Sequence, residues 1–178
     1  MIETIPHTKN FCGGNFQDWL DVMLTPKCNG KCSFCIEKTG FKPTESVNWA
    51  VLGDAIIKAN KTNILLLGGE PTLYPALPEL IIFLKQMKKN ITITTNGGKL
   101  MNEDFLRYLQ GVSAVNISIH HYELSTNREI TGIPLTTYGL QTAVNKLHSM
   151  GAKVRINCNC ISGYIDSEVQ IHRFIRIE

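Results

Sequence analysis

Three cysteines close to the N-terminal end of this 178-residue sequence are the residues best suited to chemistry. Cys28, Cys32 and Cys35 lie in the stretch LTPKCNGKCSFC with the spacing C-x3-C-x2-C. Structural zinc sites commonly use four ligands, and ferredoxin-type iron–sulfur sites use four cysteines. Three neighbouring thiolates instead suit a [4Fe–4S] cluster whose fourth iron is open to a small molecule. Gly30 would let the loop wrap closely around such a cluster.

A different use of the cysteines stays open at this point. Cys12 could join the three as a fourth ligand, which would make the chain a non-catalytic iron–sulfur, zinc-binding or electron-transfer module. Cys158 and Cys160 alternate along a predicted strand, and we interpret them as small buried thiols of one strand face and not as further ligands.

The composition sets limits on the class of protein. Apolar residues make up 43% of the chain and charged residues 19%, which indicates one globular domain over residues 1–178. The net charge of +3 comes from scattered basic residues, which gives no signal for nucleic-acid binding. The sequence shows neither a signal peptide nor an apolar run long enough to span a membrane. Six cysteines without these features favour a reducing compartment, so we expect a cytoplasmic protein.

Strand and helix patterns alternate along the chain. Apolar or β-branched runs predict strands at 18–25, 63–69, 90–98, 114–121 and 152–161. Helical spacing of apolar residues predicts helices at 49–59, 77–87, 105–109 and 140–147, with Asn102 capping the third and Gly111 ending it. This alternation is typical of parallel β/α units, so we expect an open sheet or a partial (β/α) barrel of about five to six units.

The last segment, 166–178, fits two structures. Ser167 and Gln170 have the spacing of a capping box, which favours a helix, whereas alternating apolar residues would suit a sixth strand. We favour the helix, because a parallel strand so soon after the fifth would have too short a crossover. The core domain is then expected to be incomplete at its C-terminal end.

Polar residues and glycines collect where the predicted strands end. In parallel β/α folds the carboxyl ends of the strands meet at one edge, where binding sites form. The residues in these positions are Gly68, Gly69, Glu70, Thr95, Asn96, Gly97, Asn116, Ser118, His120, Arg155, Asn157 and Asn159. Asn96-Gly97 alone would be read as an ordinary turn, and His120 alone as a histidine without a catalytic role.

In this context the sequence resembles the radical S-adenosylmethionine (radical SAM) enzymes. The resemblance depends on the C-x3-C-x2-C motif after the first strand, with Phe34 before the last cysteine. It continues with Gly68-Gly69-Glu70-Pro71, Thr95-Asn96-Gly97 and Ser118 in the family's order, and it covers nearly the whole chain.

The resemblance implies how a cofactor would bind. Cys28, Cys32 and Cys35 would hold the [4Fe–4S] cluster, and S-adenosylmethionine would chelate the open iron. The residues implied to contact S-adenosylmethionine are Gly68, Gly69 and Glu70 at the methionyl amino group, Phe34 and Asn157 at adenine, Ser118 and Thr95 near the ribose and methionyl groups, and Arg155 at the carboxylate.

The resemblance also implies the reaction. One electron, from an external donor such as flavodoxin or ferredoxin, would pass through the cluster to the sulfonium. The resulting 5′-deoxyadenosyl radical would take a hydrogen atom from a substrate. The family core usually has six units, and this chain shows about five and no cysteine-rich C-terminal extension. The substrate, small molecule or peptide, is therefore not identified, and a truncated inactive relative is an alternative.

The cysteine assignment can be tested by single substitutions. Changing Cys28, Cys32 or Cys35 to Ala should abolish the visible absorbance of the cluster after anaerobic reconstitution, because each thiolate binds its own iron. Cys12→Ala should keep that absorbance. Loss of the cluster in Cys12→Ala would show that the site uses four cysteines.

Overall fold

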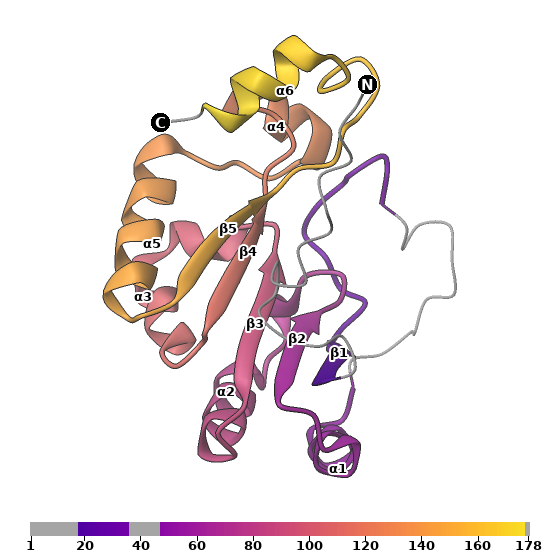
Figure 1. The fold of residues 1–178 in the computed structure, drawn as a ribbon, viewed down its shortest axis with the longest axis vertical. Coiled ribbons are helices and arrows are strands. Elements are labelled where there is room, and N and C mark those ends of the chain that lie inside the picture. Colours follow the sequence, from indigo (N-terminus) through magenta and orange to yellow (C-terminus); the bar gives the residue numbers. More distant parts are fainter. Residues whose placement is uncertain (1–17, 36–46, 177–178) are drawn as a thin grey trace, which may run out of the picture.

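One parallel sheet organises the molecule. The computed structural model describes residues 18–35 and 47–176 (Figure 1). In this part of the chain the strands are β1 (Trp19–Met23), β2 (Asn63–Leu67), β3 (Asn90–Thr95), β4 (Ala114–Ser118) and β5 (Lys153–Asn157). All neighbours are parallel, and the spatial order β1-β2-β3-β4-β5 is the order in the sequence. A doubly wound sheet reverses its order partway, so this order confirms the predicted partial β/α barrel.

Helices connect the strands. They are α1 (Trp49–Ala59), α2 (Leu77–Gln86), α3 (Glu103–Leu106), α4 (Leu124–Thr131), α5 (Thr137–Ser149) and α6 (Glu168–Ile175). Asn102 caps α3 as predicted, because its side chain accepts hydrogen bonds from the backbone N–H groups of Asp104 and Phe105. The α-helical part of this segment ends at Leu106 and a 3-10 turn, Arg107–Leu109, completes it before Gly111.

The two faces of the sheet differ in chemistry because side chains alternate along a strand. On the outer face, Leu66, Ile93 and Ile117 are fully buried in the apolar core, together with residues of α2 and α5. On the concave face, Thr94 of β3 is in register with Asn116 of β4. The helices therefore cover the apolar face, and the concave face carries polar side chains.

The final helix, α6, confirms the favoured interpretation of the last segment. The Ser167 side chain accepts a hydrogen bond from the Gln170 N–H, and the Gln170 side chain accepts one from the Ser167 N–H, which completes the capping box. With a helix here, β5 is the last strand of the sheet among the described residues. Phe174 packs against the core, whereas Ile175 is 72% exposed.

Helix α4 was not predicted from the sequence. Its residues LSTNREIT include few apolar side chains, so the helical period is hard to see. Gly132 ends the helix in a left-handed conformation, with φ of 75°. Asn127, Ile130 and Thr131 are all buried. This tertiary packing, and not the intrinsic helix propensity of the residues, stabilises the short helix.

The prediction for the fifth strand was too long. Strand β5 ends at Asn157, and the following residues Cys158 and Cys160 lie in irregular structure. Cys158 is half-buried and Cys160 is exposed, so the interpretation of both as buried strand thiols was wrong. The pKa of the Cys158 thiol is raised to about 11, mainly by burial and to a lesser extent by the neighbouring Cys160. The Cys158 thiol is therefore protonated at neutral pH.

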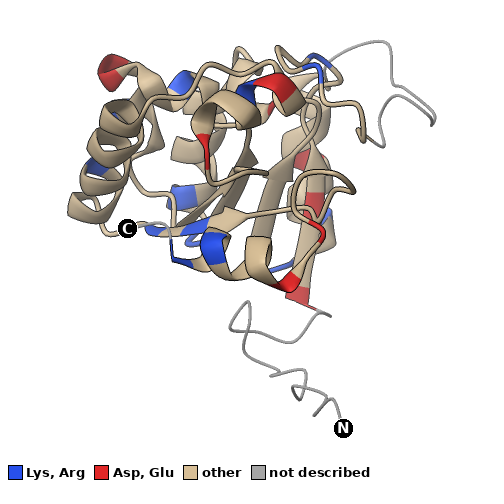
Figure 2. Cartoon of the chain, turned by 90° about the horizontal axis from the view of Figure 1, so that it is seen from above, with Lys and Arg blue, Asp and Glu red and all other residues tan. Residues whose placement is uncertain are grey.

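Basic and acidic residues are distributed over the fold. Positions of Lys and Arg lie on several separate elements, and positions of Asp and Glu are present in the same view (Figure 2). Among the described residues, no helix combines the length and the apolar character that crossing a membrane requires.

Candidate active site

The cysteine loop follows β1 and packs against the end of β2. The Gly69 N–H donates a hydrogen bond to the Thr25 carbonyl at 2.7 Å, and the Glu70 N–H donates one to the Lys27 carbonyl at 2.8 Å. These two bonds continue the pairing of β1 with β2 beyond the strands themselves. The loop that carries Cys28 is therefore fixed at the carboxyl edge of the sheet.

The two glycines after β2 are required by this close approach. A Cβ atom on Gly68 would lie 2.5 Å from the Thr25 carbonyl oxygen, and one on Gly69 would lie 2.5 Å from the Lys27 carbonyl oxygen. Gly68 also has φ of 149°, a conformation that other residues rarely adopt. The structure thus gives Gly68 and Gly69 a packing role, and their contact with S-adenosylmethionine stays a prediction.

Two of the cysteine side chains face a common space. A Cβ added to Gly30 would lie 3.4 Å from the Cys28 sulfur and 3.7 Å from the Cys32 sulfur. The Gly30 N–H already donates to Cys28 Sγ at 3.2 Å, and the Cys35 N–H bonds to the Cys32 carbonyl at 3.3 Å. A Cβ at position 30 would contact both sulfurs and would lie 3.3 Å from the Thr131 carbonyl oxygen, so Gly30 lies between the two thiols and α4.

Metal-ligating side chains do not gather at one point in the described part of the chain. In residues 18–35 and 47–176, no group of three or more His, Cys, Asp or Glu residues is placed to hold one ion. Cys12, the fourth ligand of the alternative, lies outside the described residues.

Glu70 is the centre of the hydrogen bonds that join β2 to β3. Its side chain is 1% exposed. One carboxylate oxygen accepts hydrogen bonds from the Thr72 N–H at 3.1 Å, the Thr72 hydroxyl at 2.6 Å and the Thr95 hydroxyl at 2.7 Å. The other oxygen accepts from the Asn96 N–H at 2.7 Å. This pattern gives Glu70 and Thr95 a positioning role, and their contact with the cofactor stays a prediction.

Helix α4 supports the cysteine loop from the side opposite Gly69. The Lys31 N–H donates to the carbonyl of Thr131 at 2.6 Å, and the Cys32 sulfur lies 4.0 Å from the same oxygen. A Cβ on Gly132 would lie 3.3 Å from the Cβ of Lys31. The unpredicted helix is thus part of the site, because its last turn holds the middle of the loop.

His120 also touches the loop, although no sequence pattern singles it out. Its ring meets the Phe34 ring edge-on, with 4.8 Å between centroids. Its Nδ1 atom accepts a hydrogen bond from the Asn159 N–H at 3.1 Å, and its backbone N–H donates to Asn127 Oδ1 at 2.8 Å. His120 therefore links the loop, α4 and the segment after β5. A signal in the sequence was its position two residues after Ser118, just beyond the end of β4.

The remaining predicted residues line the concave face beside this edge. Strand register pairs Asn116 with Arg155 and Ser118 with Asn157, which places all four side chains on one face. The Asn116 side-chain N–H donates to the Thr94 hydroxyl at 3.2 Å. The carboxamide oxygen of Asn116 is buried without a hydrogen-bond partner among the described residues. The structure thus places Ser118, Arg155 and Asn157 on one face of the sheet, and their contact with S-adenosylmethionine stays a prediction.

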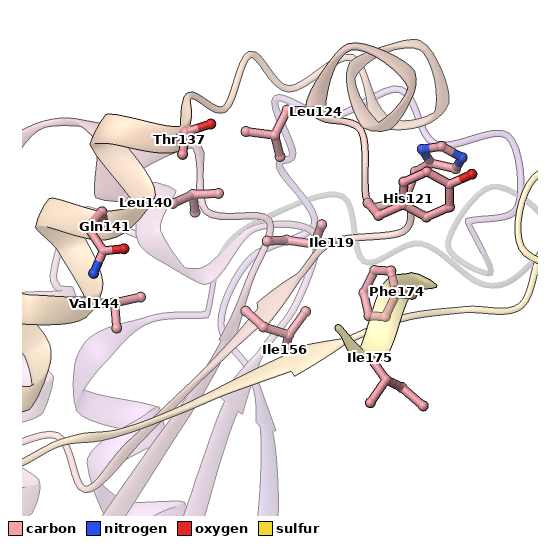
Figure 3. A pocket seen from close by; sticks show the side chains of 11 residues that line it. Ile119, His121, Leu124, Thr137, Leu140, Gln141, Val144, Ile156, Phe174 and Ile175 are labelled. Carbon is pink, nitrogen blue, oxygen red and sulfur yellow. The ribbon is translucent and has the colours of Figure 1, made fainter. Parts of the chain in front are cut away.

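A separate pocket lies on the outer face of the sheet. Its volume is about 660 Å³, and it is bounded by Ile119 and Ile156 of the β4–β5 region, Leu140 of α5, and Phe174 and Ile175 of α6 (Figure 3). These side chains are apolar, and the cysteines do not line the pocket. The outer pocket is therefore distinct from the candidate site on the concave side.

The fold and the loop geometry agree with a comparison to protein families. The family model for the radical SAM superfamily matches residues 22–175. The chain belongs to this superfamily. The match includes the three cysteines and every residue that the sequence placed in the cofactor site.

Related sequences carry more specific names. The chain is 28% identical over 171 residues to molybdenum cofactor biosynthesis protein 1 of Bos taurus, with 88% of this chain and 26% of that protein aligned. It is 27% identical over 169 residues to the mitochondrial GTP 3′,8-cyclase of Arabidopsis thaliana, with 88% of this chain and 42% of that protein aligned. The chain thus spans less than half the length of these relatives.

Solved structures share the fold. Streptococcus suis SuiB bound to S-adenosylmethionine superposes with a TM-score of 0.69 at 23% identity, over 90% of this chain and 37% of that chain. TYW1 with a lysine-pyruvate adduct superposes with a TM-score of 0.58 at 19% identity, over 90% of this chain and 62% of that chain. At these identities the likeness confirms the partial β/α barrel.

The Glu70 hydrogen bonds predict the effect of one isosteric change. Glu70→Gln should lower the free energy of unfolding by about 1–3 kcal/mol, because either orientation of the amide points an N–H₂ group at another donor. The exposed Glu129→Gln is the control and should change stability by less than about 0.5 kcal/mol. Urea unfolding followed by circular dichroism measures both values, and equal stabilities for the two variants would contradict this reading of Glu70.

The environment of His120 predicts an acid-sensitive fold. Burial lowers the pKa of His120 below the ordinary histidine value. Above about pH 6.5 the ring is neutral in the folded and unfolded chain. Below that pH the unfolded chain binds the proton first, so stability falls as the pH falls. Protonation would also remove the acceptor for the Asn159 N–H.

The contribution of His120 protonation to stability can be measured by comparing urea unfolding midpoints at about pH 7.5 and about pH 5.5. His120→Gln should lose less stability on acidification than the parent chain, because glutamine does not titrate. His148→Gln, at an exposed position of α5, should behave like the parent. An unchanged pH dependence in His120→Gln would contradict the prediction.

Proposed function

We propose that this protein is a radical SAM enzyme that cleaves S-adenosylmethionine reductively and uses the product to take a hydrogen atom from a substrate. The observation that carries the proposal is the cysteine loop at the carboxyl edge of the sheet. There the sulfurs of Cys28 and Cys32 flank Gly30, and the backbone lies against Gly69. Membership of the radical SAM superfamily supports the same conclusion.

The donor set fits the cofactor that the family implies. Cys28, Cys32 and Cys35 would hold a [4Fe–4S] cluster, with one thiolate on each of three irons. When bound with S-adenosylmethionine, the cluster supplies the electron that breaks a carbon–sulfur bond and yields a 5′-deoxyadenosyl radical. The electron comes from an external one-electron donor, such as a flavodoxin or a ferredoxin.

The protein's part in this chemistry is binding and orientation. The segment Gly68–Glu70 would bind the methionyl amino group, and its position is fixed by the buried Glu70 carboxylate. Arg155 would pair with the methionyl carboxylate, since a guanidinium forms strong hydrogen bonds with carboxylates. Ser118 and Thr95 would lie near the ribose and methionyl groups, and Phe34 and Asn157 near the adenine.

The concave face suits a polar substrate. Thr94, Asn116 and Arg155 form one row across β3, β4 and β5, and the buried Asn116 carboxamide oxygen lacks a hydrogen-bond partner in the described part of the chain. Relatives of this chain are named GTP 3′,8-cyclases, so GTP is the first substrate to test. The alignments cover 26% and 42% of the length of these relatives, so the substrate of the whole protein is part of the proposal.

Anaerobic reconstitution followed by reduction with dithionite tests the activity. The reconstituted protein should convert S-adenosylmethionine to 5′-deoxyadenosine and methionine, and Cys32→Ala should form neither. Formation of 5′-deoxyadenosine should rise when GTP is added if GTP is the substrate. A reconstituted protein that holds the cluster and releases no 5′-deoxyadenosine would refute the enzymatic proposal.

Binding of S-adenosylmethionine tests the role of the segment after β2 separately. Glu70→Gln should weaken the affinity measured by calorimetry and keep the cluster absorbance, because the change displaces the segment and leaves the cysteines in place. An unchanged affinity would remove Glu70 from the cofactor site.

A further inference from the structure

Asn96 connects the end of β3 to the cysteine loop through its side chain. Its Nδ2 group donates a hydrogen bond to Asn29 Oδ1 at 2.8 Å and lies 3.8 Å from the sulfur of Cys28, within the range of an N–H···S hydrogen bond. Its backbone N–H donates to Glu70 at 2.7 Å. One residue thus touches a cysteine of the loop and the carboxylate that fixes the neighbouring segment.

The orientation of the Asn96 carboxamide is set by its surroundings. Its oxygen accepts a hydrogen bond from the Gly98 N–H at 2.9 Å. A carboxamide turned the other way would place its N–H₂ group against this N–H donor. The N–H₂ group must therefore face the cysteine loop.

The turn after β3 does not explain this N–H₂ group. The turn uses the Asn96 oxygen as acceptor and the left-handed Gly97, which has φ of 80°. Aspartate or serine at position 96 could supply the same acceptor. What only the asparagine adds is the pair of contacts to Asn29 and Cys28.

Cys28 differs from Cys32 in the groups that surround its sulfur. The Gly30 N–H lies 3.2 Å from Cys28 Sγ, so two N–H donors point at this atom. The Cys32 sulfur lies 4.0 Å from a carbonyl oxygen, that of Thr131. A thiolate accepts N–H hydrogen bonds well, and such bonds to the sulfurs of an iron–sulfur cluster favour the reduced, more negative state.

We propose that Asn96 is a positioning residue that holds Cys28 in place for the cluster and raises the cluster's reduction potential by donating a hydrogen bond to the Cys28 thiolate. The inference rests on the proposed function, since it needs the cluster to be present. It extends that function because Asn96 also bonds to Glu70. Through Asn96, the segment that would bind the methionyl group and a cysteine that would bind iron share one hydrogen-bonded connection.

The test removes the N–H₂ donor of residue 96 and keeps a side-chain oxygen that can accept from the Gly98 N–H. Asn96→Ser retains a neutral side chain that can accept from the Gly98 N–H and removes the N–H₂ group. The matched control is Asn102→Ser, because the Asn102 side chain acts as the acceptor at the start of α3 and serine serves equally there. Both proteins are reconstituted anaerobically, and circular dichroism compares their folding with that of the parent.

Two measurements on the cluster then decide. A spectroelectrochemical titration without S-adenosylmethionine should give a more negative reduction potential for Asn96→Ser than for the parent and Asn102→Ser. Release of iron to a chelator should be several-fold faster in Asn96→Ser, because Cys28 is less firmly held. Asn96→Asp should also give a more negative reduction potential and a faster release of iron. A folded Asn96→Ser protein with parental potential and parental iron release would overturn the proposal.

A measurement on the parent protein covers the case in which the variants fail to fold. With asparagine labelled by ¹⁵N at the side-chain amide, pulsed EPR of the reduced cluster should detect a weakly coupled ¹⁵N nucleus. If this coupling is absent in the parent protein, the proposed hydrogen bond from Asn96 to Cys28 is wrong, and no variant is needed for that conclusion. A parent protein that forms no cluster at all would instead refute the proposed function, so the two failures are distinguishable.

Discussion

The buried carboxylate of Glu70 is the interaction on which the candidate site depends. A carboxylate that is 1% exposed is costly unless donors surround it, and here two threonine hydroxyls and two backbone N–H groups do so. These donors belong to the segment after β2 and to the end of β3 with the residue that follows it. The same residue donates its own N–H to the cysteine loop. Three loops at one edge of the sheet are therefore held by a single side chain and its backbone.

The close contact of backbones is the second constraint. The cysteine loop lies so near to Gly68 and Gly69 that a methyl group at either position would collide with a carbonyl oxygen. Because the sheet is parallel and its order follows the sequence, the ends of β1 and β2 are neighbours at this edge. Topology, glycine and cysteine spacing thus act together, and none of them alone would place the loop.

The sequence predicted those features that have a strong local signal. Five strands, the capping box at Ser167 and the cap at Asn102 follow from local pattern and local hydrogen bonds, and the structure has them. Helix α4 was missed because tertiary packing, not apolar period, stabilises it.

In the candidate site, too, local sequence patterns were informative and long-range contacts were not. The cysteine motif was recognisable from spacing. The roles of Asn96 and His120 were not, since Asn-Gly is an ordinary turn signal and a single histidine has no pattern. Their contacts join segments that lie 68 and 39 residues apart in the sequence, and no local signal reports such contacts.

The contact between the cysteine loop and α4 has a consequence for the order of folding. Cys32 and Thr131 are 99 residues apart in the chain, and the loop takes support from this helix as well as from β2. During synthesis the cysteines leave the ribosome long before Thr131 does. The loop therefore reaches its docked conformation only after the fourth strand and its helix have emerged. The proposed cluster would therefore be inserted after most of the described chain has been synthesised, since before then the thiols lack the support of α4.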